Sequence, residues 1–162
     1  MRVWELRRTY RMSGLSEENL PTGPYDLLTL WMEQAIEAEV NEPNAMSLAT
    51  VKPDNTPDVR MVLLKEIEKE GVTFYTNYNS QKAQDLGHHP HAACCFWWPE
   101  LERQIRLRGS VERTSRELSA AYFANRPRLS QIGAWASVQS QIIERREVLE
   151  QAAAAQEERY RD

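Results

Sequence analysis

The chain has 162 residues, which fits one domain and allows a hydrophobic core without disulfides or metal ions. Its 41% hydrophobic and 27% charged residues are typical of a soluble globular protein, and a net charge of -4 argues against broad nucleic-acid binding. No apolar run reaches the roughly 20 residues of a membrane helix, and the N-terminus lacks the apolar stretch of a secretory signal. We therefore expect one cytoplasmic domain over residues 1–162 that does not contact membranes.

The first 24 residues are polar and end in the breakers Pro21, Gly23 and Pro24, which predicts an arm on the surface. Asp26 is predicted to cap a helix, because apolar residues recur after it at helical spacing up to Ile36. The period then changes to two, which predicts antiparallel strands joined by turns. The expected strands cover residues 45–52, 58–67, 72–77, 91–98 and 103–112.

Helices are expected between and after these strands. Ser80 is predicted to cap a short helix that ends at Gly87. The run from Thr114 to Glu117 matches a capping box and predicts a helix that ends before Pro127. A last helix is predicted over residues 141–159. Five short strands with peripheral helices indicate a mainly β fold, an antiparallel barrel decorated by helices.

Cysteine and histidine give no reason to expect a metal site. Cys94 and Cys95 are adjacent, and neighbouring strand residues point to opposite faces, so we expect reduced thiols. His88, His89 and His91 lie close together, but adjacent side chains diverge and no carboxylate stands at useful spacing. We interpret the histidines as solvated loop residues.

Three segments combine residue types that suit an anion. The strand from Arg60 to Lys65 could line a flat aromatic ligand and pair with phosphate at its ends, although composition alone favours two solvated basic ends. The strand–helix junction that ends at Lys82 offers free backbone N–H groups, and ordinary helix capping explains it equally well. Residues 122–135 place Tyr, Arg and Ser donors around the bend at Pro127.

Taken together and in order, five stretches resemble the pyridoxamine (pyridoxine) 5′-phosphate oxidase family. They are residues 42–51, Arg60 to Lys65, residues 74–77 with 80–82, residues 101–104, and residues 126–135 running to Gln139 and Ser140. The resemblance spans nearly the whole chain and implies an antiparallel split β-barrel. It also implies a homodimer with one flavin mononucleotide (FMN) in each of two clefts between subunits. The run Phe96-Trp97-Trp98 is interpreted as barrel core or dimer surface, not as a platform for nucleic-acid bases.

The resemblance also assigns residues to a cofactor and a substrate. Those that would hold FMN are Arg60, Met61, Val62, Leu63, Leu64, Lys65, Tyr75, Thr76, Gln81, Lys82, Gln104, Gln139 and Ser140. Those that would hold a phosphorylated substrate are Arg7, Arg8, Tyr10, Lys65, Tyr122, Arg126 and Ser130, the first three from an arm that closes over it. No side chain is assigned as a catalyst, because the flavin would supply the redox chemistry.

The implied function is FMN-dependent oxidation of pyridoxamine or pyridoxine 5′-phosphate to pyridoxal 5′-phosphate, with O2 as acceptor and H2O2 as product. Two alternatives stay open: a related split-barrel flavoprotein with another substrate, and a non-catalytic binder of FMN or pyridoxal phosphate. Gln81 stands where the family commonly has Arg, which predicts weaker flavin binding. The family's C-terminal strands, with a flavin-contacting Trp and an Arg-x-His segment, are not in this sequence, so we expect a fragment or a shortened member.

Overall fold

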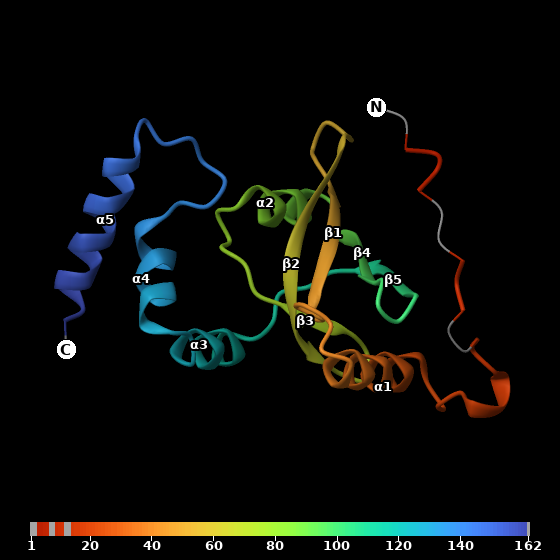
Figure 1. Cartoon of the computed structure of the whole chain (residues 1–162). Helices are drawn as coiled ribbons and strands as arrows, with labels where there is room; N and C mark the ends of the chain where they lie inside the picture. Colours follow the sequence, from red (N-terminus) through yellow and green to blue (C-terminus); the bar gives the residue numbers. More distant parts are fainter. Residues whose placement is uncertain (1–2, 7–8, 12–13, 162) are drawn as a thin grey trace.

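The computed structural model describes residues 3–6, 9–11 and 14–161 (Figure 1). Its elements in chain order are η1 (Glu17–Asn19), α1 (Pro24–Glu37), β1 (Ala45–Val51), β2 (Pro57–Ile67), β3 (Val72–Phe74), α2 (Gln81–His88), β4 (His91–Trp98), β5 (Arg103–Ser110), α3 (Arg116–Ala124), α4 (Arg128–Ala136) and α5 (Arg146–Arg159). Arg7 and Arg8, two of the predicted substrate-binding residues, lie outside the described residues. Within the described ranges, no helix combines the length and apolar character needed to cross a membrane.

The five strands form one antiparallel sheet in the order β3-β2-β1-β4-β5. The central strand β1 pairs Leu48 with Arg60 on one side and with Cys94 on the other. The turn between β1 and β2 places Asn55 at a φ of 65°, a left-handed conformation in which Asn is enriched. A register shift between Leu64 and Glu66 interrupts the β2–β3 pairing, as a β-bulge does.

Strand alternation gives the sheet a buried inner face and an exposed outer face. Helix α1 packs on the inner face, and the side chains in the resulting core include Leu28, Met32, Ala35, Met46, Leu48, Leu64, Phe96 and Trp98. Each large apolar side chain buried there contributes about 1.5–3 kcal/mol. The indole N–H of Trp98 donates to the carbonyl of Pro43 at 2.9 Å, so this buried polar group is also satisfied. The core therefore fixes the strands that carry the site described below.

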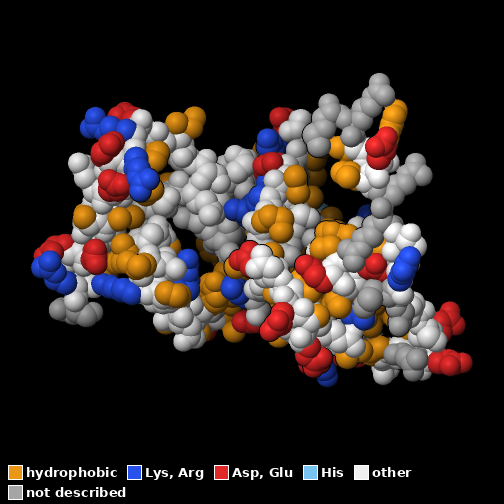
Figure 2. Space-filling view, viewed as in Figure 1, with side chains coloured by type: hydrophobic (Ala, Val, Ile, Leu, Met, Phe, Trp, Pro, Cys, Tyr) orange, Lys and Arg blue, Asp and Glu red, His pale blue; other side chains and the backbone are white. Residues whose placement is uncertain are grey.

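Helices α3, α4 and α5 extend to one side of the sheet, while the N-terminal arm lies on the other side (Figure 1). The rings of Trp135 and Tyr160 bring the ends of α4 and α5 together, with centroids 6.1 Å apart. Among the side chains described in these three helices, only Ile132 is fully buried. Hydrophobic side chains lie on the surface of this segment (Figure 2). The exposed apolar residues include Leu129, Trp135, Val138, Ile142, Ile143 and Val148.

Two predicted helix starts need correction, and a third is confirmed. Helix α1 begins at Pro24 with Gly23 as N-cap, so Asp26 lies in its first turn; proline suits the first helical position because its missing N–H would have no partner there. Ser115, not Thr114, caps α3, because its hydroxyl accepts a hydrogen bond from the N–H of Leu118 at 3.1 Å. Ser80 is the N-cap of α2, as predicted, but its side chain makes no capping bond.

The region after α3 also differs from prediction. Residues 128–136, predicted as part of a bend, form helix α4, because Pro127 occupies its N-cap and does not interrupt it. Helix α5 begins at Arg146, not at residue 141. Ser140 has a φ of 69°, a left-handed conformation that no α-helix continues through.

Candidate functional site

An open pocket lies where β2, the start of α2 and the segment after α4 meet. Its volume is about 460 Å³. The residues that line it are Asp58, Val59, Arg60, Met61, Gln81, Lys82, Gln139 and Ser140. Six of these eight are among the residues predicted to hold FMN, namely Arg60, Met61, Gln81, Lys82, Gln139 and Ser140. The fold thus joins residues from three separate stretches of the sequence.

The guanidinium of Arg60 is held by four polar groups. Its Nη1 donates to the carbonyl of Leu48 at 3.1 Å and to Oγ1 of Thr50 at 2.7 Å. Its Nη2 donates to the carboxylate of Asp58 at 2.8 Å and lies 3.7 Å from Oδ2 of Asp85. A guanidinium with a fixed orientation can offer its planar donors to a phosphate without reorganising.

Lys82 places a second cation in the pocket. It lies in the first turn of α2, where backbone N–H groups lack intrahelical acceptors, and it is 8% exposed. Its Nζ donates to Oε1 of Gln139 at 3.1 Å, and Thr76 donates to the same oxygen at 3.3 Å. Burial and the neighbouring charge of Arg60 lower the pKa of Lys82, while Asp58 acts in the opposite direction. Two cations held together in this way favour an anion between them.

A buried carboxylate lies behind these cations. Asp85 is 0% exposed and accepts hydrogen bonds from Oγ1 of Thr50 at 2.7 Å and from Nε2 of Gln81 at 2.8 Å. Gln81 therefore directs its amide to Asp85. Sequence reasoning missed Thr50, Asp58 and Asp85. Two signals were available: Asp58 and Arg60 are two residues apart on a strand, and Gln81 and Asp85 are four apart on a helix, so each pair shares a face.

A second cluster joins the far end of β2 to α3. Nζ of Lys65 lies 5.9 Å from the centre of the Tyr122 ring. This ring stacks on Tyr75, with centroids 3.8 Å apart and planes 5° from parallel. The Tyr75 hydroxyl donates to Glu66 at 3.3 Å, and desolvation together with the charge of Glu66 raises the pKa of Tyr75. Predicted cofactor and substrate residues therefore meet at this end of the strand.

The bend between α3 and α4 carries Arg126 and Ser130. The amide of Gln131 closes the bend by donating to the carbonyls of Ala124 at 3.2 Å and of Arg126 at 2.8 Å. The Arg126 guanidinium lies over the ring of Phe123, 6.0 Å from its centre. Both predicted substrate residues therefore lie shortly after Tyr122 in the chain, one in the bend and one in the first turn of α4.

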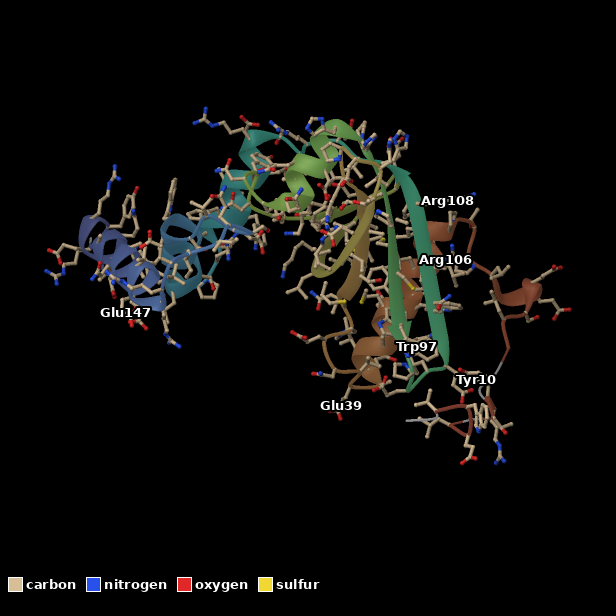
Figure 3. The ribbon with its side chains drawn as sticks, turned by 90° about the horizontal axis from the view of Figure 1, so that it is seen from above. Tyr10, Glu39, Trp97, Arg106, Arg108 and Glu147 are labelled. Atoms are coloured by element: carbon tan, nitrogen blue, oxygen red, sulfur yellow. The ribbon has the colours of Figure 1, made fainter. Side chains whose placement is uncertain are left out.

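Other predicted residues lie elsewhere in the chain. Gln104 is on β5, the edge strand opposite β3, where it pairs with Trp97. Tyr10 lies near the turn between β4 and β5 (Figure 3), and the neighbouring Arg11 is tied to this turn by a 2.7 Å bond from its N–H to Glu102. A single chain does not bring Gln104 or Tyr10 to the pocket.

The apolar residues predicted on β2 divide between its two faces. Val62 packs against the core and Leu64 belongs to it, whereas Met61 and Leu63 are exposed. Because Val62 and Leu64 face the core, a ligand at the pocket would reach them through their backbone groups.

The donor set suits a phosphate monoester such as the one at the end of FMN. Arg60 and Lys82 supply two positive charges, and Thr76 and Ser140 supply hydroxyl groups near or in the same pocket. Charge-assisted hydrogen bonds from such groups are about twice as strong as neutral ones. The observation that decides whether a phosphate suits this pocket is the state of Lys82. Its side chain is largely buried, and its ammonium group has no acidic hydrogen-bond acceptor of its own among the contacts described.

Comparison with known proteins finds relatives along nearly the whole chain. The family model for pyridoxamine 5′-phosphate oxidase matches residues 32–160. The chain belongs to this family. A pyridoxine/pyridoxamine 5′-phosphate oxidase of Gloeothece citriformis is 50% identical over 158 residues, which are 98% of this chain and 74% of the relative. One from Cyanothece sp. is 51% identical over 160 residues, 99% of this chain and 75% of the relative.

Solved structures confirm the predicted fold class. PhzG from Burkholderia lata 383, in complex with tetrahydrophenazine-1-carboxylic acid, has a TM-score of 0.84 at 28% identity over 90% of this chain and 73% of its own. A pyridoxamine 5′-phosphate oxidase-related, FMN-binding protein of Nostoc punctiforme has a TM-score of 0.64 at 17% identity over 81% of this chain and 73% of its own. The curled five-stranded antiparallel sheet of this family member is thus the half-barrel of a split-barrel fold.

Proposed function

We propose that the chain binds FMN and oxidises pyridoxine or pyridoxamine 5′-phosphate to pyridoxal 5′-phosphate. One O2 would be reduced to H2O2 for each substrate oxidised. With the amine substrate, water would replace the nitrogen, which leaves as ammonia. Membership of the family supports this reaction class, and the names of the relatives support the substrate.

The observation that carries the proposal is the pairing of Arg60 and Lys82 in one pocket. Their Nη2 and Nζ groups would bind the FMN phosphate, with Gln139 and Ser140 beside them. Met61, Leu63 and the backbone of β2 would then follow the flavin toward Lys65. Arg60 and Lys65 are five residues apart on an extended strand, about 17 Å, which leaves room for a flat ring system between them.

The second cluster, together with Arg126 and Ser130 from the bend after α3, would bind the phosphate of the substrate. Lys65 supplies a positive charge, Tyr122 and Ser130 supply hydroxyl groups, and Arg126 supplies a second positive charge. The Tyr75–Tyr122 stack fixes the position of the Tyr122 hydroxyl, because two parallel rings 3.8 Å apart restrict each other's rotation. Anchoring the phosphate at one end would hold the reacting carbon at a set distance from the flavin.

When bound, FMN supplies the acceptor for the hydride that leaves the carbon bearing the substrate's amine or alcohol. The residues of this chain bind and orient; none is required to act as an independent oxidant. Binding energy from two phosphates, remote from the reacting carbon, would assist the hydride transfer by fixing its geometry.

One experiment tests the reaction directly. The purified chain is incubated with FMN, and its flavin absorbance is recorded after removal of unbound cofactor. Pyridoxine 5′-phosphate is then added under air, and H2O2 and pyridoxal 5′-phosphate are measured together. We expect a yellow protein that forms both products in equal amounts. A chain that takes up no flavin at all contradicts the proposal.

The similarity to PhzG favours a second candidate, a flavoprotein that acts on a different ring system. In that case the chain would bind FMN but form no pyridoxal 5′-phosphate, and tetrahydrophenazine-1-carboxylic acid, the compound bound to PhzG, would reduce its flavin. A chain that binds FMN and is reduced by neither substrate would be a non-catalytic binder.

We also propose that two copies of the chain complete the site. Trp97 is 50% exposed on the outer face of β4, and Arg106 and Arg108 line β5 beside it (Figure 3). Met61 is 64% exposed on the outer face of β2. Between them β1 presents the small residues Ala45, Ser47 and Ala49 on the same face, as the strand register requires. A broad and partly apolar sheet face of this kind suits a second copy.

A second copy would also explain why two of the predicted site residues lie far from the pocket in a single chain. Gln104 and Tyr10 lie at the β5 edge, remote from the pocket at β2, and a partner could bring its own edge to this chain's pocket. Sedimentation of wild type and Trp97→Glu tests the proposal, since a buried charge at the interface should shift the dimer to monomer. Ile36→Glu, a change of the same type at an exposed position of α1, is the control and should leave the mass unchanged.

A further inference from the structure

The charges around the FMN-phosphate pocket cancel. Arg60 and Lys82 carry two formal positive charges, and Asp58 and Asp85 carry two negative ones. A phosphate monoester brings between about one and a half and two further negative charges at neutral pH. The pocket would therefore become strongly negative on binding unless one of the carboxylates withdrew.

The two carboxylates differ in their freedom to withdraw. Asp85 is fully buried and is held by hydrogen bonds from Thr50 and Gln81. The side chain of Asp58 is 36% exposed, lines the pocket, and accepts bonds only from Arg60 and from the N–H of Val59 among the contacts described. Rotation of Asp58 toward water would thus break one ion pair, whereas movement of Asp85 would disrupt a buried network.

Arg60 keeps its position when Asp58 leaves. Its Nη1 is fixed by the carbonyl of Leu48 and the hydroxyl of Thr50, both on the central strand β1. Only Nη2 is engaged by Asp58, at 2.8 Å. A phosphate oxygen could accept from Nη2 in place of Asp58 without any change in the guanidinium plane, because the two acceptors use the same donor.

We propose that Asp58 is an intramolecular competitor for the FMN phosphate, which occupies Nη2 of Arg60 until the phosphate displaces it. The inference rests on the proposed function, since it concerns the same pocket. Asp58 thereby sets the affinity for the phosphate end of the cofactor and leaves the affinity for the ring system unaffected. Partial desolvation raises the pKa of Asp58, but the charge and hydrogen bond of Arg60, the N–H of Val59 and the charge of Lys52 together lower it, so the competitor is ionised at neutral pH.

The test compares FMN with riboflavin, which has the same ring and no phosphate. Both dissociation constants are measured by quenching of flavin fluorescence in wild type and Asp58→Asn. Asparagine keeps an Oδ1 that accepts from Val59, so the backbone is not disturbed. We expect FMN to bind about three to ten times more tightly to the variant and riboflavin to bind equally to both, and the gain should shrink as salt is added.

Two further variants separate this role from a general charge effect. Asp54→Asn removes the same charge in the β1–β2 turn, where Asp54 bonds to Thr56 and does not line the pocket; it should change neither constant. Asp58→Glu restores the carboxylate and should return FMN affinity to about the wild-type value.

Three results would overturn the inference: FMN affinity unchanged in Asp58→Asn, FMN affinity weakened, or an equal gain for FMN and riboflavin. In each case wild type still binds FMN, so the proposed function survives. If neither wild type nor the variant binds FMN, the proposed function fails and the inference fails with it.

Discussion

The sheet with α1 and α2 differs sharply from the segment formed by α3, α4 and α5. In the sheet, alternate residues such as Phe96 and Trp98 are almost fully buried, and even the polar Asp85 has its partners within the chain. In the helical segment Ile132 is the one fully buried side chain among those described, and apolar residues such as Leu129 face outward.

The difference shows which part of the proposed site one chain can build alone. The pocket around Arg60 and Lys82 is attached to strands fixed by the core. The substrate residues Tyr122, Arg126 and Ser130 lie on helices that bury little of their own surface. The apolar residues that those helices expose are not covered by the rest of the chain among the residues described.

The largest expected effect tests the difference in burial. Phe96→Ala should lower the free energy of unfolding by about 3–5 kcal/mol, because it leaves a cavity in the core. Leu129→Ala, in α4, should change it by less than about 0.5 kcal/mol, because that side chain is 78% exposed. Urea unfolding of both variants gives the two values. Similar losses would mean that the helical segment is as tightly packed as the sheet.

The next largest expected effect is that of Lys82→Met on the affinity for FMN. Methionine keeps most of the chain length but removes a charge-assisted hydrogen bond, so FMN should bind about 10–100 times more weakly. Riboflavin should bind as in wild type. Lys69→Met, at an exposed position in the β2–β3 turn, is the control. Equal weakening by both variants would point to net charge and not to the pocket.

Tyr122→Phe should have a moderate effect, and only on the substrate. The phenyl ring keeps its stack on Tyr75, and the loss of one hydroxyl should raise KM for pyridoxine 5′-phosphate about two- to tenfold. The FMN dissociation constant should stay within twofold of wild type. Steady-state kinetics and flavin titration measure the two quantities, with Tyr78→Phe as control on an exposed ring. Loss of FMN affinity in Tyr122→Phe would show that the two clusters are not separate.

The smallest expected change is an increase in FMN affinity in Gln81→Arg. Arginine adds a charge beside Lys82, but Asp85 already accepts from residue 81 at 2.8 Å and would pair with the new guanidinium. FMN should therefore bind about two to five times more tightly, which fluorescence titration can resolve. Gln84→Arg, on an exposed face of the same helix, should have a smaller effect. Equal FMN affinity in wild type and Gln81→Arg would refute the idea that the neutral side chain weakens binding.

Sequence patterns located all five strands, because burial on one face imposes a period of two that can be read directly. They failed where local signals compete. Thr114 and Ser115 are both suitable caps, and in the structure Ser115 takes this role by accepting a hydrogen bond from the N–H of Leu118. Pro127 indicates a helix end as much as a helix start, so α4 was predicted as a bend. At each of these positions the residue types suit both alternatives, so the local pattern does not choose between them.

The sequence by itself determined the family, the order of the strands along the chain and the identity of most residues that line the pocket, since these follow from short motifs and periodic burial. Only the tertiary structure decided that Arg60, Lys82 and Gln139 meet, that Asp58 and Asp85 balance their charge, and that Gln104 and Tyr10 lie at the opposite edge. The physical reason is that ion pairs and hydrogen bonds act over a few ångströms in space. The chain brings such groups together from distant positions only when the core has set the sheet.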